Sequence, residues 1–385
     1  MPSPPMPSPP LPRHLPRPTA LPAPRTGARD RPTLLLTGGS GVLGRALIDE
    51  LAADHDLLCL VRNRPLGDPR VRELRGDLLA PRLGLTPLAW HELALEVDVV
   101  LHSAAETNWR MRPADIERTN IHGTEVVLDL AARADAPLYL VSTAFVASAP
   151  SEEDARRFPG AAAYLASKTM AEQLVRKADL PGAIVRPSVV MGDSSSGRIA
   201  GQQGLTKTLG SMVLGQVPVL PGAPDARVDM VPQDYVTRAV GDLVRGGVGS
   251  GEFWLTAGKE APRLSEIADI CAEFAVRRGL PAPQRPRLIP VEAVHRLLLP
   301  MLEGTALPEA TRRRFQHYAE LLLVFQRELP FDTSLGRPHC GTRLSHAGIR
   351  AALVRNLESW ADDRPALLTR HRAARIVTTP TEVAS

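Results

Sequence analysis

The sequence predicts an α/β fold of the Rossmann type, in which a doubly wound parallel sheet is followed by a smaller, mostly helical C-terminal part. Short runs rich in Val and Leu recur between helical stretches and lack polar alternation, which is typical of strands buried on both faces of a parallel sheet. A glycine-rich turn joins the first run to the first helix. After about Gly192 the alternation gives way to Gly/Pro-rich loops and isolated helices.

The expected elements alternate along the chain in the order that a doubly wound fold requires. Strands are predicted at residues 33–37, 57–61, 97–101, 138–141 and 183–185. Helices are predicted at 42–53, 87–95, 113–134 and 161–177, and in the C-terminal part at 264–278, 291–302, 310–325 and 345–360.

The composition excludes several classes of protein. The 385 residues carry a formal net charge of +4, but residues 1–31 hold five Arg and one Asp, and residues 364–385 hold four Arg and one Glu. The body between these ends is slightly acidic, so no nucleic-acid partner is expected. Three distant cysteines give neither a disulfide framework nor a metal site, and they favour a cytoplasmic location. No apolar run is long enough to span a membrane.

The glycine-rich turn predicts a dinucleotide site, because it follows a strand and opens a helix. Gly38 permits the tight turn, Gly41 lets backbone amides approach a pyrophosphate at the helix N-terminus, and Gly44 lets the helix pack closely on the strand. The site residues expected in this turn are Thr37, Gly38, Ser40, Gly41, Val42, Leu43 and Gly44.

The following strand ends indicate which dinucleotide binds. An acidic residue after the second strand would favour NAD, but this chain has Arg62, with Arg64 close by. An arginine can pair with a 2′-phosphate, so NADP(H) is favoured over NAD(H). The alternative is a solvent-facing arginine, since 42 of the 46 basic residues are Arg. Further cofactor contacts are expected from Asp77 and Leu78, near the adenine, and from the small residues Ser103, Ala104 and Ala105.

Three side chains predict proton transfer. Tyr164 and Lys168 lie one helical turn apart on the same face of a predicted helix. Tyrosine has an unperturbed pKa of about 10, and a neighbouring ammonium is expected to lower this pKa and to hold the nicotinamide ribose. Thr143 follows a strand end, where it either hydrogen-bonds the reacting oxygen or simply caps the next turn.

Together, these motifs resemble the extended short-chain dehydrogenases/reductases. The stretches VDVVLHSAAETNW, TNIHGTEVVLDLA, VSTAFV, IVRPSVVMGDSSSG and DMVPQDYV are similar to the thioester-reductase branch, which includes male-sterility-like fatty acyl reductases and the reductase domains of some nonribosomal peptide and polyketide assembly lines. The resemblance implies a catalytic triad of Thr143, Tyr164 and Lys168. It also implies cofactor binding by the glycine turn, Arg62 and Asp77, and by the turn of Arg186, Pro187, Ser188 and Val189, which with the loop from Gly192 shapes the substrate side.

The reaction implied by the resemblance is reduction of an acyl thioester, carried on CoA or on a separate carrier protein, to an aldehyde or an alcohol. Hydride reaches the carbonyl carbon, Thr143 and Tyr164 stabilise and protonate the oxyanion, and the hemithioacetal releases a thiol. The reductase is expected to be free-standing, and an isologous homodimer is the commonest assembly. Two alternatives stay open: a nucleotide-sugar epimerase, dehydratase or hydroxy/keto oxidoreductase of the same family, and a non-catalytic NADP-binding regulator.

These observations divide the chain into four segments. Residues 1–31 form a proline-rich tail, expected to be extended or disordered. Residues 32–192 form the dinucleotide-binding Rossmann domain with the catalytic triad. Residues 193–363 form the substrate-binding region, with strands that return to the Rossmann sheet, and residues 364–385 form a flexible tail.

Overall fold

The structure is a computed structural model that describes residues 30–148, 152–201, 204–223, 225–290 and 330–376, with single positions between 291 and 329. Nearly all of the proline-rich tail, the helices expected at 291–302 and 310–325, and residues 377–385 lie outside the described residues. Among the described residues, no helix combines the length and the apolar character of a membrane span.

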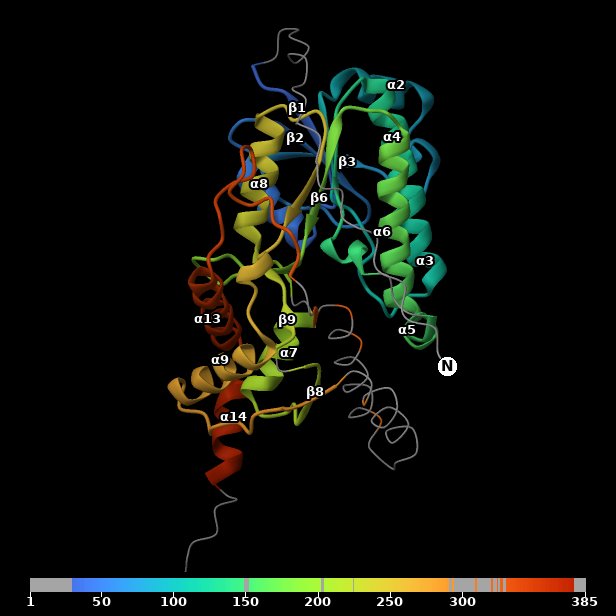
Figure 1. Cartoon of the computed structure of the whole chain (residues 1–385). Coiled ribbons are helices and arrows are strands. Elements are labelled where there is room, and N and C mark those ends of the chain that lie inside the picture. The colour runs from blue at the N-terminus through green and yellow to red at the C-terminus, as the bar shows by residue number, and fades with distance from the viewer. Residues whose placement is uncertain are drawn as a thin grey trace, which may run out of the picture.

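A seven-stranded parallel sheet forms the centre of the larger part of the molecule (Figure 1). Its strand order is β11-β6-β5-β4-β1-β2-β3, and every neighbouring pair is parallel. The chain changes direction across the sheet between β1 and β4, which is where such folds bind ligands. The predicted Rossmann-type fold is therefore confirmed. The strands are β1 (Thr33–Thr37), β2 (Asp56–Val61), β3 (Val71–Arg75), β4 (Val99–His102), β5 (Leu138–Val141), β6 (Gly182–Pro187) and β11 (Glu252–Leu255).

Helices cover both faces of this sheet. On one face α1 (Val42–Leu51) packs against α8 (Gln233–Arg245), and Arg245 joins them by donating to Glu50 and Asp54. On the other face α2 (Pro87–Glu96), α4 (Gly123–Ala134) and α6 (Pro159–Lys177) lie side by side (Figure 1). The helix expected at 113–134 consists of α3 (Pro113–Glu117), a π-helical turn η2 (Arg118–His122) and α4.

The smaller part lies beyond the carboxyl ends of the strands and is mostly helical (Figure 1). Three two-stranded pairs, β7–β10, β8–β12 and β9–β13, support it. Its helices are α7 (Gly204–Val213), α9 (Leu264–Arg277), α13 (His346–Asp362) and α14 (Pro365–Ile376). Its strands are β7 (Val189–Met191), β8 (Val219–Pro221), β9 (Arg227–Val228), β10 (Met230–Pro232), β12 (Arg287–Ile289) and β13 (Gln326–Arg327). The remaining short helices are η1 (Pro81–Gly84), η3 (Ala144–Ala147), α5 (Glu152–Arg157) and η4 (Gly258–Glu260).

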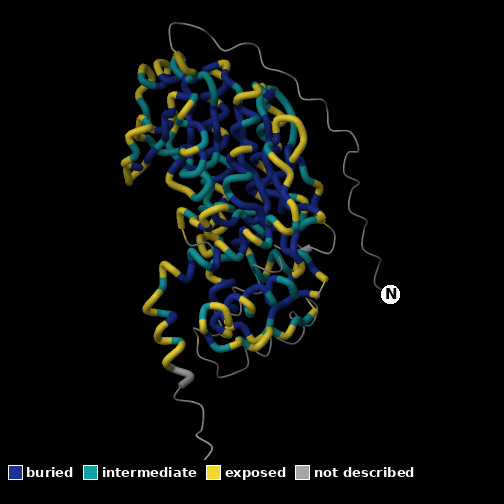
Figure 2. Tube along the Cα trace, turned by 90° about the vertical axis from the view of Figure 1, so that its left-hand side faces the viewer, coloured by how far each residue is buried: buried dark blue, intermediate teal, exposed yellow. Residues whose placement is uncertain are grey.

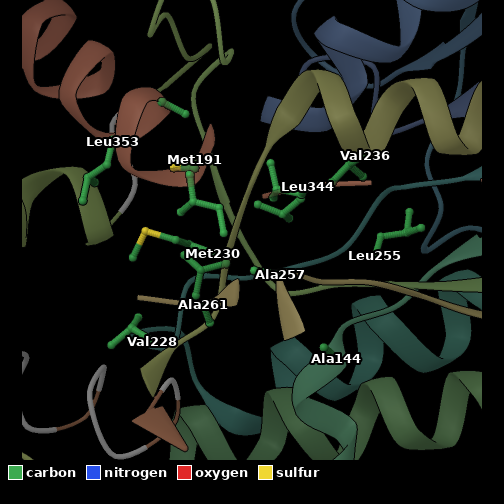
Figure 3. Close-up of a cluster of buried hydrophobic side chains, with 14 of the residues drawn as sticks. Ala144, Met191, Val228, Met230, Val236, Leu255, Ala257, Ala261, Leu344 and Leu353 are labelled. Atoms are coloured by element: carbon green, nitrogen blue, oxygen red, sulfur yellow. The ribbon is translucent and has the colours of Figure 1, made fainter. Parts of the chain in front are cut away.

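A continuous apolar core joins the two parts, as the buried segments in Figure 2 indicate. Figure 3 shows the junction, where Met191 of β7 and Met230 of β10 lie with Leu255 of β11 and Leu353 of α13. Each of these four side chains is buried. A second core cluster fills the opposite face of the sheet, below α2 and α4. The carboxyl ends of the strands, where the site lies, are thus supported by core packing on both faces of the sheet.

Two elements differ from the expectations. β3 was not predicted as a strand, because it is an edge strand with a mainly exposed, polar sequence. The stretch from 364 was expected to be flexible, but residues 365–376 form α14, which packs against α13. Leu368 is buried, while most of its neighbours are exposed. A helix that buries so few side chains has little apolar periodicity in its sequence.

Candidate active site

The glycine-rich turn lies at the carboxyl end of β1, directly against the residues that follow β4. Gly38 has a φ of +78°, and a Cβ built on it would lie 2.6 Å from the backbone nitrogen of Ala104. A Cβ on Gly44 would overlap the carbonyl oxygen of Gly38. A side chain is thus excluded at both positions, because its Cβ would clash with nearby backbone. At Gly38 the positive φ would also strain any other residue. Backbone groups, including those of Ser103, therefore line the switch point between β1 and β4.

The N-terminus of α1 is suited to bind an anion. Gly41 is its N-cap, no side chain caps the helix, and its first turn holds no acidic residue. By contrast, Thr86 and Ser345 cap α2 and α13. Free backbone amides at a helix N-terminus bind pyrophosphate well, so these residues fit a dinucleotide. Ser40, Val42 and Leu43 lie in the same turn and are exposed or half-buried, whereas Thr37 is buried.

Arg62 and Arg64 lie just beyond β2, the neighbour of β1 in the sheet. Both are exposed, and neither forms an ion pair with another described residue. Arg70, further along the same loop, is already paired with Asp49 and Asp68. Unpaired guanidinium groups at this strand end are available to a phosphate.

Asp77 and Leu78 follow the third strand of the sheet. One carboxylate oxygen of Asp77 accepts from the Leu79 amide over 3.0 Å, and the preceding Gly76 amide donates to the Val61 carbonyl. Leu78 packs beside the start of α4. The structure thus brings this turn back toward the end of β2, with both side chains half-buried.

Thr143 and Tyr164 bring two hydroxyl groups together at the carboxyl end of β5. Thr143 is the N-cap of η3, where its Oγ1 accepts from the Phe145 amide over 3.4 Å, and Tyr164 lies in α6. Burial raises the pKa of Tyr164 to about 12, while a hydrogen bond between the Tyr164 and Thr143 side chains acts in the opposite direction. The phenol is therefore protonated at neutral pH, which is the form that donates a proton. The Trp109 ring lies 6.1 Å from the Tyr164 ring, centroid to centroid.

Lys168 does not lower the pKa of Tyr164 as the sequence suggested. Its Nζ donates to the Val141 carbonyl over 2.6 Å, and the residue is only 4% exposed. Burial lowers the pKa of Lys168 itself to about 8, with the charge of Glu172 acting against this shift. The expectation is corrected because the ammonium is directed to the end of β5, while burial dominates the pKa of the phenol. A contact with a nicotinamide ribose stays a prediction.

The side chain of Arg186, on β6, forms an ion-pair network with Glu252 and with Glu172, which lies one helical turn beyond Lys168 in α6. It donates to the two carboxylate oxygens of Glu172 over 2.8 and 2.6 Å and pairs with Glu252 at 2.7 Å. Its guanidinium carbon also lies 4.6 Å from the centroid of the Trp254 ring. The Nε and one terminal nitrogen of Arg186 are thus occupied within the protein, and a cofactor contact from this residue stays a prediction.

Two buried hydroxyl groups at the carboxyl ends of the strands have no hydrogen-bond partner among the described residues. They belong to Ser142, at the end of β5, and Ser188, between β6 and β7. A buried hydroxyl without a partner costs about 1–3 kcal/mol, so a polar ligand at this edge would relieve the cost. Pro187 and Val189, which flank Ser188, are both buried.

The loop that begins at Gly192 connects the smaller part to the site. Asn356 of α13 accepts from the Gly192 amide over 2.6 Å, and Asp234 accepts from both the amide and the hydroxyl of Ser194. Further along, Gly201 approaches the dinucleotide turn, since a Cβ on it would lie 3.9 Å from Val42. The loop is thus anchored by α13 of the smaller part and by α8 of the larger part, and it reaches the dinucleotide turn.

Several buried polar residues beside the site were not predicted to belong to it. They are His102 at the end of β4, Asn120 in η2, Thr124 in α4, Ser167 in α6 and Ser142. In the sequence, each of them is a polar residue within an otherwise apolar or helical stretch. This pattern does not distinguish a functional contact from a solvent-exposed position. The structure brings them within hydrogen-bond distance of one another or beside Thr143.

Comparisons with known proteins agree with this geometry. Residues 66–240 match the family described as Male sterility protein. Glycine betaine reductase ATRR of Emericella nidulans is 32% identical over 252 residues, which are 55% of this chain and 20% of that protein. The chain thus spans about a fifth of that relative's length. The terminal R domain from the myxalamid PKS-NRPS biosynthetic pathway is 26% identical, with 88% of this chain and 92% of that chain covered at a TM-score of 0.67.

A third similarity concerns the fold alone. The Bordetella bronchiseptica enzyme WbmG, solved with NAD and UDP, is 18% identical, with 86% of this chain and 94% of that chain covered at a TM-score of 0.58. The fold and these similarities define an NAD(P)-binding oxidoreductase. The match over residues 66–240 and the similarity to the myxalamid R domain support the thioester-reductase branch of the extended short-chain dehydrogenases/reductases.

Proposed function

We propose that the protein reduces an acyl thioester, carried on CoA or on the pantetheine arm of a carrier protein, at the carboxyl ends of β4 and β5. The observation that supports this most is the Thr143–Tyr164 hydroxyl pair, which lies beside the buried Lys168 at the same sheet edge as the glycine turn. The similarity to a PKS-NRPS terminal R domain favours a thioester over other carbonyl substrates.

In this reaction each residue of the site would have a distinct role. A nicotinamide dinucleotide held by the glycine turn supplies the hydride. Tyr164, protonated because burial raises its pKa to about 12, donates a proton to the thioester oxygen, and Thr143 holds that oxygen by a hydrogen bond. Lys168 provides a positive charge beside the reacting groups. Collapse of the resulting hemithioacetal breaks the C–S bond and gives an aldehyde and a thiol.

The proposed reaction is tested by offering purified protein NADPH with acyl-CoA, acyl-pantetheine or an acyl carrier protein. We expect NADPH oxidation together with thiol release. One NADPH per thiol would identify the aldehyde as product, and two would identify the alcohol, so the same measurement determines the extent of reduction. Turnover of UDP- or dTDP-sugars with no thioester turnover would instead establish the epimerase-like alternative, which the fold shared with WbmG also accommodates.

We further propose that NADPH is the preferred dinucleotide, because Arg62 is exposed at the end of β2 without an ion-pair partner among the described residues. Arg62→Ala should weaken NADPH binding by about ten-fold, the scale of one lost charge-assisted contact, and leave NADH binding nearly unchanged. Dissociation constants for both cofactors, measured by fluorescence titration, check this. Arg70→Ala is the matched control, since that arginine of the same loop is already paired. Equal weakening of both cofactors by Arg62→Ala would contradict the assignment.

The buried thiols fit a reducing compartment. Cys59, Cys271 and Cys340 are all free and buried, and burial raises each thiol pKa to about 12. We therefore propose the cytoplasm as the location of this protein.

A further inference from the structure

His102 lies at the centre of a chain of buried hydrogen bonds beside the dinucleotide turn. Its Nδ1 is 2.7 Å from Thr37 Oγ1, and its Nε2 is 3.2 Å from Thr124 Oγ1. All three residues are at most 1% exposed. The imidazole thus bridges the ends of β1 and β4 to the first turn of α4.

The surrounding contacts determine the direction of each hydrogen bond. Thr124 Oγ1 donates its single proton to the Asn120 carbonyl over 2.7 Å, because a carbonyl can only accept. Toward His102 this hydroxyl can therefore only accept, so Nε2 must carry the ring proton. At the other end Thr37 Oγ1 accepts from the Ala104 amide over 3.2 Å. Its own proton is then free for Nδ1, which accepts it.

The protonated imidazolium does not suit these contacts. It would donate from both nitrogens, so Thr37 Oγ1 would accept twice and its own proton would lose the acceptor that Nδ1 provides. Burial and the nearby charge of Lys168 also lower the pKa of His102, to about 3. The neutral ring with its proton on Nε2 is the form that satisfies every partner.

The series of hydrogen bonds continues from Asn120 to α6, the helix that carries Tyr164 and Lys168. Asn120 Nδ2 donates to Ser167 Oγ over 2.9 Å, and Ser167 Oγ donates to the Tyr164 carbonyl over 2.8 Å. Asn120 lies in the π-helical turn η2. Its Oδ1 also accepts from the Glu106 amide, and its Nδ2 donates to the Glu106 carbonyl. One set of contacts thus connects the residue before Gly38, the residues after β4 and the helix of Tyr164.

We propose that His102 is a positioning residue, held as the neutral Nε2–H tautomer, that fixes the dinucleotide turn relative to the helix of Tyr164 through Thr124, Asn120 and Ser167. A rigid ring with an acceptor on one side and a donor on the other is what this bridge needs. The inference rests on the proposed dinucleotide site but not on the identity of the thioester.

The tautomer is measured directly by a long-range ¹H–¹⁵N correlation spectrum of the histidine rings in the full chain at neutral pH, assigned with His102→Asn. We expect a protonated Nε2 and an unprotonated Nδ1 for His102. An Nδ1–H tautomer or an imidazolium would overturn the proposal. This readout needs neither cofactor nor substrate, so it is independent of whether the proposed reaction is correct.

The positioning role is tested with Thr124→Val and Thr124→Ser. The valine removes the hydroxyl that joins His102 to Asn120 and should weaken NADPH binding and lower kcat, each by about ten-fold. The serine retains the hydroxyl and should restore both. His55→Asn is the control for the His102→Asn variant, since His55 is a buried histidine outside these hydrogen bonds that bonds to Asp54 before β2. Unchanged NADPH affinity and kcat in folded Thr124→Val would reduce the bridge to a structural feature and overturn the proposal.

Discussion

Tyr164→Phe is expected to lower kcat for thioester reduction by about 10²- to 10⁴-fold, the range that a positioned general acid contributes. The change removes the one phenol that is hydrogen-bonded to Thr143 and leaves a ring of the same shape. Because the phenol is not part of the glycine turn, the dissociation constant of NADPH should change little. Stopped-flow or steady-state NADPH oxidation measures the first quantity, and fluorescence titration measures the second.

Tyr139→Phe is the matched control for Tyr164→Phe. The hydroxyl of Tyr139 is also buried, but it donates to the Leu243 carbonyl over 3.3 Å in the core between β5 and α8. Its loss should cost about 1 kcal/mol of stability and leave kcat of the folded protein unchanged. If Tyr164→Phe retained wild-type kcat, Tyr164 would be removed from the proposed mechanism.

Gly44→Ala is expected to abolish measurable dinucleotide binding and to destabilise the protein by about 1–3 kcal/mol, the usual cost of overpacking. The new Cβ would overlap the Gly38 carbonyl and approach the backbone of Gly39. Neither contact is relieved by a side-chain rotation, so α1 must move away from the turn. Thermal unfolding and NADPH titration give the two quantities.

Gly123→Ala provides the comparison within the same sheet region. Gly123 opens α4, and a Cβ on it would make only ordinary contacts with Leu78, the nearest at 3.6 Å. Since alanine is the better helix former by about 1 kcal/mol, this variant should be as stable as the wild type or slightly more so. If both variants lost NADPH binding equally, the close fit of Gly44 against Gly38 would not be what determines NADPH affinity.

The sequence was most informative where local pattern and tertiary role coincide. The strand at 33–37 matches β1, and the strand at 138–141 matches β5, because strands buried on both faces of a parallel sheet have nearly continuous apolar sequences. It was less informative for β3, which has a polar sequence at the sheet edge, and for η2, since a π-helical turn within 113–134 has no clear signal in the apolar periodicity.

For the site, residue types were easier to predict than their partners. Spacing placed Tyr164 and Lys168 on one face of α6, but it did not reveal that Lys168 is directed to the Val141 carbonyl. Likewise, the Arg186 side chain is held by Glu172 and Glu252, which are respectively 14 and 66 positions away in the chain. Such partners depend on how strands and helices pack, and one sequence does not contain that information in local form.

The pairing of β6 with β11 has a consequence for how the chain is synthesised. β6 ends at Pro187, but the strand that covers its outer edge begins at Glu252. While the intervening residues leave the ribosome, β6 presents open backbone groups, and such edges pair readily with other chains. For the same reason, cutting the chain after β7 to isolate a dinucleotide-binding fragment would expose this edge and deprive Arg186 of Glu252. We therefore expect that the dinucleotide-binding segment folds stably only together with α8 and β11.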